Sequence, residues 1–442
     1  MQRSQNCRLA AWLVALMALL IPGQIHCQTG SQKENNVEIL CQTSPADIKK
    51  VQVPLQPLRS ATGPAVLATA PPMEHACYAC PYANPQQNSR CVGLPSNGPW
   101  RIRWQSRLAE GFEPRFVLID DERVVVQAGT WQLFDLQGKA LAGARIGPGQ
   151  MAVDSTSGLF YSVNINGYVV AHELADGKVK FILLPTGADS FARPLIVPWG
   201  QRLFVSGFEL PSGDHVPDTA AVEVINLGSP LVIESQLLVS AVTEKTLHLK
   251  TATLTVAANG QTIVFAVPDA ICFADRSLEI TAAYGAQFKP LAMSLDEASR
   301  AYLIVETGGR RALWLVTPKG ERVFAFALPP SEEPFPRPPV VGYNHRTFIA
   351  AGGTLLAISQ DGKELWKRQL SGSRVGMIVT PNGDLLVSDG PELAVYNKDG
   401  ERKRLYEFAG QELCTPPVLT ADGELLVASK ENLYCLTPQP AK

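Results

Sequence analysis

Residues 355–366 decide the fold, because they read Leu-Leu-Ala-Ile-Ser-Gln-Asp-Gly-Lys-Glu-Leu-Trp. An apolar, strand-like run comes first, Asp361-Gly362 follows, and a second run ends in Trp366. A two-residue loop between antiparallel strands requires backbone with φ > 0, which Asp-Gly pairs supply. The stretch therefore predicts a β-hairpin with a tight turn.

This hairpin recurs along the chain. Its turn glycines are Gly138, Gly177, Gly320, Gly362 and Gly400, so neighbouring copies lie 39, 42 and 38 residues apart. The second and third of these glycines lie 143 positions apart, which leaves room for two weaker copies, and a last copy occupies residues 416–436. Units of about 40 residues with four short strands each are the signature of a β-propeller. We therefore predict an all-β, eight-bladed propeller, with seven blades as the alternative count.

The eight units begin at recognisable strands. Their first strands are expected near Phe116, Met151, Leu195, Ala252, Ala292, Val340, Met377 and Val418. The eighth unit ends after its third strand, whereas residues 100–108 form an orphan strand before the first unit. Pairing of this N-terminal strand with the last blade would close the ring and remove an open sheet edge. The competing architecture is a pair of β-sandwiches, which internal repeats disfavour.

The repeats resemble those of the PQQ-like (quinoprotein alcohol dehydrogenase-like) β-propeller family. Residues 355–366 are similar to its tryptophan-docking motif, in which a Trp after an Asp-Gly-Lys turn packs against the neighbouring blade. The resemblance implies structural roles for Trp104, Trp366 and the turn glycines. Residues 377–387 also resemble the gluconolactonase and NHL type of propeller, and four-stranded blades are shared with WD40 proteins.

The resemblance carries two functional implications. Catalytic members hold pyrroloquinoline quinone over Ca²⁺, usually with a disulfide between adjacent cysteines and an Asp base. This sequence has no Cys-Cys pair and no clear match to that calcium site. Other members have kept the fold, lost the cofactor and act as protein-binding scaffolds. We therefore expect a non-catalytic member with no cofactor. Ca²⁺ or quinone belongs only to the alternative, a PQQ-dependent dehydrogenase or a gluconolactonase-like hydrolase.

The N-terminus reads as a signal peptide over residues 1–27. Arg3 and Arg8 precede an unbroken apolar run at residues 9–21, which is short for a membrane span. We expect export to the periplasm or the exterior of a bacterial cell; an uncleaved anchor is the competing interpretation. Residues 28–98 are rich in Pro and Gln and are expected to form an extended, partly disordered lead-in without strands, because prolines such as Pro54 and Pro57 interrupt them. The propeller is expected over residues 99–437, followed by a tail at 438–442.

A cysteine cluster lies in this lead-in. Cys77, Cys80 and Cys91 have spacings that suit either disulfides, with Cys41 as the fourth partner, or a zinc site that includes His75. Export favours disulfides. The other histidines (His172, His215, His248 and His345) are scattered and are expected at ordinary surface or strand positions.

Charge and motifs exclude several function classes. The formal net charge of −2 gives no reason to expect nucleic acid as a partner. The sequence lacks a Gly-x-Ser-x-Gly elbow and the glycine fingerprints of nucleotide-binding folds. Long connections at residues 184–194, 209–219 and 328–337 are expected on one face of the ring. We therefore expect a monomeric binding or scaffold module for a protein or glycan, without a membrane span after removal of the signal.

Overall fold

The computed structural model describes the chain in part. Described are five short strands between residues 33 and 60, and residues 99–439 except 110–113, 115, 120–121, 128–130, 145–150, 155–156, 164–168, 185–190, 200–201, 210–218, 227–231, 241–254, 259–261, 268, 276–278, 332–335, 373–374 and 421. These residues form strands and turns throughout. None of the described segments is a helix long and apolar enough to cross a membrane.

The strands form eight separate sheets, numbered here 1 to 8 along the chain. Each has a core of four antiparallel strands. The strands of sheets 1 and 2 are β7 (Phe116–Ile119), β8 (Arg123–Gln127), β9 (Trp131–Asp135) and β10 (Ala140–Ala144), then β11 (Met151–Asp154), β12 (Leu159–Val163), β13 (Val169–Glu173) and β14 (Val179–Leu184).

Sheets 3 to 5 continue the same order. Their strands are β15 (Phe191–Trp199), β16 (Arg202–Glu209), β17 (Thr219–Asn226) and β18 (Val232–Ser240); β19 (Thr255–Ala258), β20 (Ile263–Val267), β21 (Ala270–Ala274) and β22 (Ile280–Gly285); and β23 (Lys289–Leu295), β24 (Ala301–Thr307), β25 (Arg310–Val316) and β26 (Glu321–Ala327).

Sheets 6 to 8 complete the series, and the last one takes its fourth strand from the front of the propeller region. Their strands are β27 (Val340–Val341), β28 (Thr347–Ala351), β29 (Thr354–Ile358) and β30 (Glu364–Gln369); β31 (Val375–Val379), β32 (Leu385–Asp389), β33 (Glu392–Tyr396) and β34 (Arg402–Glu407); and β35 (Val418–Leu419), β36 (Leu425–Ala428), β37 (Asn432–Pro438) and β6 (Trp100–Arg107).

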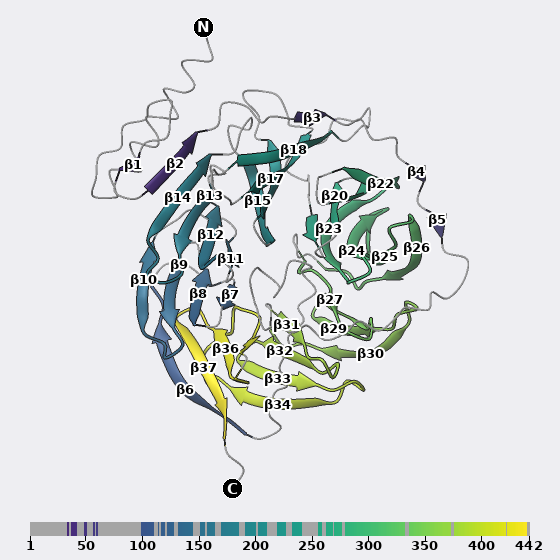
Figure 1. Cartoon of the computed structure of the whole chain (residues 1–442). Coiled ribbons are helices and arrows are strands. Elements are labelled where there is room, and N and C mark those ends of the chain that lie inside the picture. Colours follow the sequence, from purple (N-terminus) through teal and green to yellow (C-terminus); the bar gives the residue numbers. More distant parts are fainter. Residues whose placement is uncertain are drawn as a thin grey trace.

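Figure 1 shows the sheets around a common centre, with first strands inside and fourth strands on the outer rim. Seven of the eight first strands lie in or at the predicted positions, and β19 begins three residues after Ala252. The orphan strand β6 pairs antiparallel with β37, with Trp104 opposite Cys435. β35 and β36 also contact β7 of the first sheet. The sequence therefore predicted an all-β, propeller-like arrangement correctly.

The core lies between the faces of neighbouring sheets. Between sheets 6 and 7, for example, Phe348, Leu355 and Trp366 pack with Met377 and Tyr396. Inner strands such as β32 are buried along their whole length, whereas the outer strand β30 buries only Trp366. This gradient matches the sequence, since inner strands are continuous apolar runs and outer strands alternate with charged residues.

The expectation that residues 28–98 contain no strands is wrong. The structure places β1 (Lys33–Glu34), β2 (Val37–Cys41), β3 (Ile48–Lys50), β4 (Gln56–Pro57) and β5 (Arg59–Ser60) in this segment. β2 to β5 pair in parallel with the outer strands β14, β18, β22 and β26 in turn. An edge strand needs partners on one side only, so even Pro57, which has no N–H, is accommodated there.

Candidate binding surface

The predicted docking residues join neighbouring sheets. Trp366 on β30 packs on the turn of sheet 7, where its Nε1 donates a hydrogen bond to Lys398 O at 3.1 Å. Gly400 in that turn has φ +75, and a Cβ there would lie 2.6 Å from the Trp366 ring. Trp104 on β6 does the same on sheet 1, with its Nε1 bonded to Leu136 O at 2.9 Å and its ring against Gly138. Both tryptophans therefore hold sheets together.

Other sheets make the same contact with different residues. Phe324 packs against Gly362, and Tyr284 packs against Gly320 while its hydroxyl donates to Pro318 O at 2.9 Å. At Gly177 the ring comes from Trp131 on the third strand β9. The sequence analysis missed Trp131. Its signal is Ala142 on the outer strand β10, which pairs with Leu133 of β9 and puts a small residue where the other sheets carry the docking ring.

His172 lies in the interface beside this last contact. Its ring stacks on Phe160 at 4.6 Å between centroids, and its two nitrogens lie 3.2 Å from Ser162 Oγ and 3.3 Å from Gly177 O. Burial lowers the pKa of His172 to about 4. The imidazole is therefore neutral at physiological pH and is fully engaged in packing.

His345 belongs to a buried polar network that the sequence did not reveal. Asp296 Oδ2 lies 2.6 Å from Arg300 Nε, and Arg300 Nη2 lies 3.2 Å from His345 Nδ1. Tyr302 also donates to the Asp296 carboxylate at 3.4 Å. The network joins the first turns of sheets 5 and 6. The buried Asp296 carboxylate is thus ion-paired with Arg300. A buried charge needs such a partner, because an unpaired charge in the protein interior is strongly destabilising.

Candidate ligands for a calcium ion are scattered or already hydrogen-bonded among the described residues. Within the described ranges, His, Cys, Asp and Glu side chains form no group of three or more that would hold a metal ion. The buried Asp389 carboxylate accepts hydrogen bonds from the backbone of Ser371 and Gly372 and from the Ser371 hydroxyl. No catalytic step through a calcium-bound quinone follows from these residues.

The cysteine and zinc predictions fall on residues outside the described side chains, namely Cys41, His75, Cys77, Cys80 and Cys91. Among the described cysteines, Cys272 and Cys435 are free and buried, and Cys414 is buried as well. Burial raises the pKa of the Cys272 thiol to about 12, which makes it a poor nucleophile.

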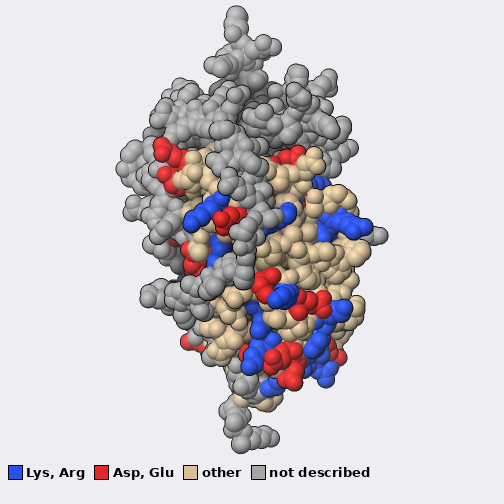
Figure 2. All heavy atoms as spheres, turned by 90° about the vertical axis from the view of Figure 1, so that its right-hand side faces the viewer, with Lys and Arg blue, Asp and Glu red and all other residues tan. Residues whose placement is uncertain are grey.

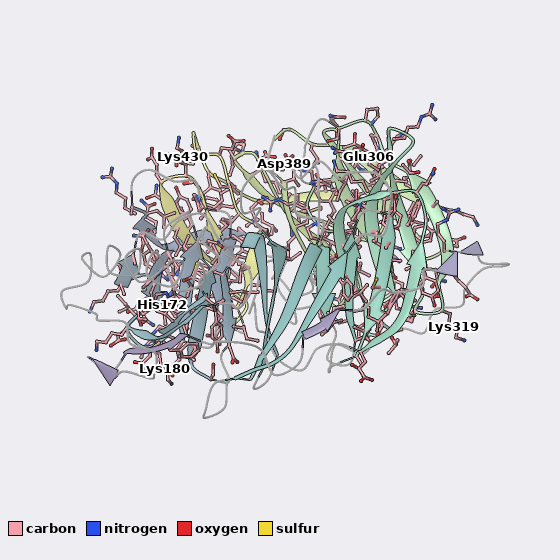
Figure 3. The ribbon with its side chains drawn as sticks, turned by 90° about the horizontal axis from the view of Figure 1, so that it is seen from above. His172, Lys180, Glu306, Lys319, Asp389 and Lys430 are labelled. Atoms are coloured by element: carbon pink, nitrogen blue, oxygen red, sulfur yellow. The ribbon has the colours of Figure 1, made fainter. Side chains whose placement is uncertain are left out.

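The predicted loop face has a counterpart in the structure. Figure 3 shows Glu306, Asp389 and Lys430 along one face of the ring and Lys180 and Lys319 on the opposite one. The long connections at 184–194, 209–219 and 328–337 join strands at the first of these faces, but 185–190, 210–218 and 332–335 lie outside the described residues. They therefore give no geometry for a binding site.

A cleft of about 540 Å³ opens on the outer rim between β26 and β30. We call it the rim cleft. Its apolar lining comes from Phe326, Leu328, Pro329 and Leu356, and its polar wall from Glu364, Lys367 and Gln369. β30 has no strand on its outer side among the described residues.

The arrangement of β30 explains this mixed lining. Trp366 points toward sheet 7, and the Arg368 Nε bonds Gly400 O at 2.7 Å on that side. The alternate residues, including the 45% exposed Leu365, occupy the other side of the strand. Figure 2, which views the side carrying β26, shows basic and acidic groups intermixed. The rim cleft thus offers apolar side chains next to charged and amide side chains, a mixture that suits a polypeptide ligand.

No family model matches the chain, and no curated protein sequence matches it. Solved structures do. BamB from Moraxella catarrhalis superposes with a TM-score of 0.54 at 10% identity, covering 76% of this chain and 99% of that one. A europium-containing methanol dehydrogenase gives 0.58 at 10% identity, covering 82% and 98%. Quinohemoprotein alcohol dehydrogenase from Comamonas testosteroni gives 0.58 at 11%, covering 83% and 82%. The chain therefore shares the PQQ-like β-propeller fold of these proteins, and the likeness extends to the fold alone.

Proposed function

We propose that this chain is an exported, closed, eight-bladed propeller that acts as a non-catalytic scaffold and binds a protein partner at the rim cleft. The observation that carries the proposal is the cleft of about 540 Å³, whose lining combines apolar side chains with charged and amide side chains. Export is supported by the signal-like residues 1–27, and the eight-bladed count by the eight consecutive sheets. The likeness to BamB supports the proposal at the level of the fold only, because the dehydrogenases have the same fold.

The rim cleft can be tested by site-specific photo-crosslinking in intact cells. A photoreactive amino acid at the exposed Leu365 should yield one discrete protein adduct. Lys367→Glu should lower its yield roughly tenfold, because about 1.4 kcal/mol of binding free energy corresponds to that factor. Lys319→Glu is the matched control. It makes the same charge change in the exposed turn between β25 and β26, on the face of the ring opposite Glu306 (Figure 3), and should leave the yield unchanged.

Two results would contradict the proposal. One is equal adduct yield in both lysine variants, which would place binding elsewhere. The other is turnover: the purified protein, supplied with Ca²⁺ and pyrroloquinoline quinone, is assayed for alcohol-dependent dye reduction, and with Ca²⁺ alone for lactone hydrolysis. We expect neither activity.

A further inference from the structure

The outer strands of the ring fall into two sets. β14, β18, β22 and β26 each pair with a strand from residues 33–60, always in parallel. β10, β30, β34 and β6 have no further strand within the part of the chain that the structure describes. Four of the sheets thus show that the outer edge accepts an extended segment, and the other four edges have no added strand among the described residues.

Three of these edges carry charged residues, which disfavour strand addition; among the covered edges only β26 pairs through charged residues, Glu321 and Arg322. β30 contains Glu364, Lys367 and Arg368; β34 contains Arg402, Lys403 and Arg404; β6 contains Arg101, Arg103 and Arg107. β10 reads Ala-Leu-Ala-Gly-Ala and carries no charge. Four of its five residues are exposed, among them Leu141 at 37%. β10 is therefore the one of these four edges without charged residues.

Packing within the propeller does not account for this composition. Ala142 must be small because Trp131 occupies the docking position against Gly177, where a Cβ would lie 2.7 Å from Trp131 Cη2. Ala140, Leu141 and Ala144 are exposed and have no such constraint. Lysine or arginine at these positions would be as acceptable as it is on β30 or β34.

The backbone of β10 is also suited to strand addition. The pairing of β10 with β9 has a register shift between Ala140 and Ala142, and the pairing of β14 with β13 has the same kind of shift. β14 nevertheless pairs with β2, beginning at Phe181, the first residue after its shift. Residues 142–144 hold the equivalent stretch of β10. In Figure 1, β10 lies on the outermost left of the ring, between β14 and β6.

We infer that β10 binds an extended, uncharged segment of a partner protein, added in parallel to its outer edge. Backbone hydrogen bonds would give the affinity, and the absence of charge on β10 would favour apolar and small residues in the partner. A second copy of this chain fits less well, because pairing of β10 with itself across a two-fold axis is antiparallel, whereas all four internal additions are parallel. The inference rests on the proposed scaffold function and adds a second contact to it.

The test uses the full chain and a fluorescent, capped hexapeptide of alternating Thr and Val as the probe. Fluorescence anisotropy should show saturable binding, and hydrogen exchange at residues 140–144 should slow. A spin label on the N-terminus of the peptide should broaden the amide signal of Ala140 more than that of Ala144, as parallel pairing requires. Leu141→Lys and Ala144→Lys should each weaken binding at least tenfold. The matched control Leu365→Lys, at the other exposed leucine, should not.

Several outcomes would overturn the inference: no probe binding, binding that Leu141→Lys leaves intact, or stronger broadening at Ala144. A dimer of the chain that Leu141→Lys dissociates would identify a second copy as the occupant and would equally overturn it. Thermal unfolding of each variant establishes that it is folded. Crosslinking from Leu365 reports the rim cleft independently. If those adducts form while the probe fails, only the β10 inference falls; if adducts fail while the probe binds, the rim-cleft proposal falls.

Discussion

Glycines in the recurring turns serve two needs at once, positive φ and contact with a ring from the preceding sheet. Gly138 has φ +82, and a Cβ there would lie 2.5 Å from Trp104 Cε3. Gly158 has φ +67 but no atom within 4 Å of such a Cβ. The pair therefore separates backbone strain from steric displacement.

We expect Gly138→Ala to lower the free energy of unfolding by roughly 2 kcal/mol more than Gly158→Ala. Both variants suffer the strain of a left-handed residue with a Cβ, but only the first must displace Trp104. Urea denaturation of both variants measures the difference. Equal losses would show that Trp104 adapts freely and that docking on Gly138 contributes little.

His172 should make stability dependent on pH. Burial lowers its pKa from 6.5 to about 4, so the fold favours the neutral imidazole. The corresponding stability is complete above pH 6.5 and is lost as the pH falls toward 4. Between pH 7.5 and 5 this residue alone should reduce the free energy of unfolding by about 2 kcal/mol. Denaturation of wild type and His172→Gln at both pH values checks this, since the variant should lose correspondingly less. A loss of the same size in the variant would assign the effect to other groups.

Strand β6 is the element on which the last sheet depends. It pairs with β37 over most of its length, docks Trp104 on sheet 1 and forms the Arg103–Glu424 ion pair at 2.6 Å. Deletion of residues 99–109 should expose the edge of β37 and remove these contacts, so we expect aggregation or loss of a cooperative transition. Circular dichroism and size-exclusion chromatography measure both, with deletion of residues 440–442 as the control. A deleted chain that stayed monomeric and unfolded at the wild-type denaturant concentration would contradict the assignment.

Elements whose structure is determined by their own residues, such as tight turns and the strands beside them, could be predicted from the sequence. The turn glycines Gly138, Gly177, Gly320, Gly362 and Gly400 identified the third and fourth strands of five of the eight sheets, because a tight turn constrains the residues within it. Strands β2 to β5 could not be found in this way. They are held by hydrogen bonds to the edges of other strands, so their own prolines and irregular pattern carry no information about pairing.

The candidate surfaces were hidden for a related reason. Neither the rim cleft nor the open edge of β10 is visible until the sheets are placed side by side and the covered edges are known. The loop residues 209–219 were the sequence-based hypothesis, since length alone marks a loop. Uncharged residues at 140–144 become informative only by comparison with the outer strands of sheets 6 to 8.

At the scale of the whole molecule, every sheet has the same core of four antiparallel strands. We expect function to depend on the positions at which the sheets differ from one another. Inner strands repeat closely because they face neighbouring sheets on both sides. Outer strands differ in charge, in docking residue and in whether a further strand covers them. Sequence variation on the rim is thus free to specify partners without altering the centre.

The two ends of the propeller region meet, since Gln439 N donates a hydrogen bond to Pro99 O at 2.8 Å. A peptide linker could span that gap, and the backbone could then be opened at an exposed turn such as Gly308-Gly309 to give a circular permutant with the same contacts. β24 and β25, which flank that turn, lie across the ring from β6 and β37 (Figure 1), so the new termini would be remote from residues 99 and 439. Fusion tags and reporter domains could in this way be attached without approaching β6 or β10.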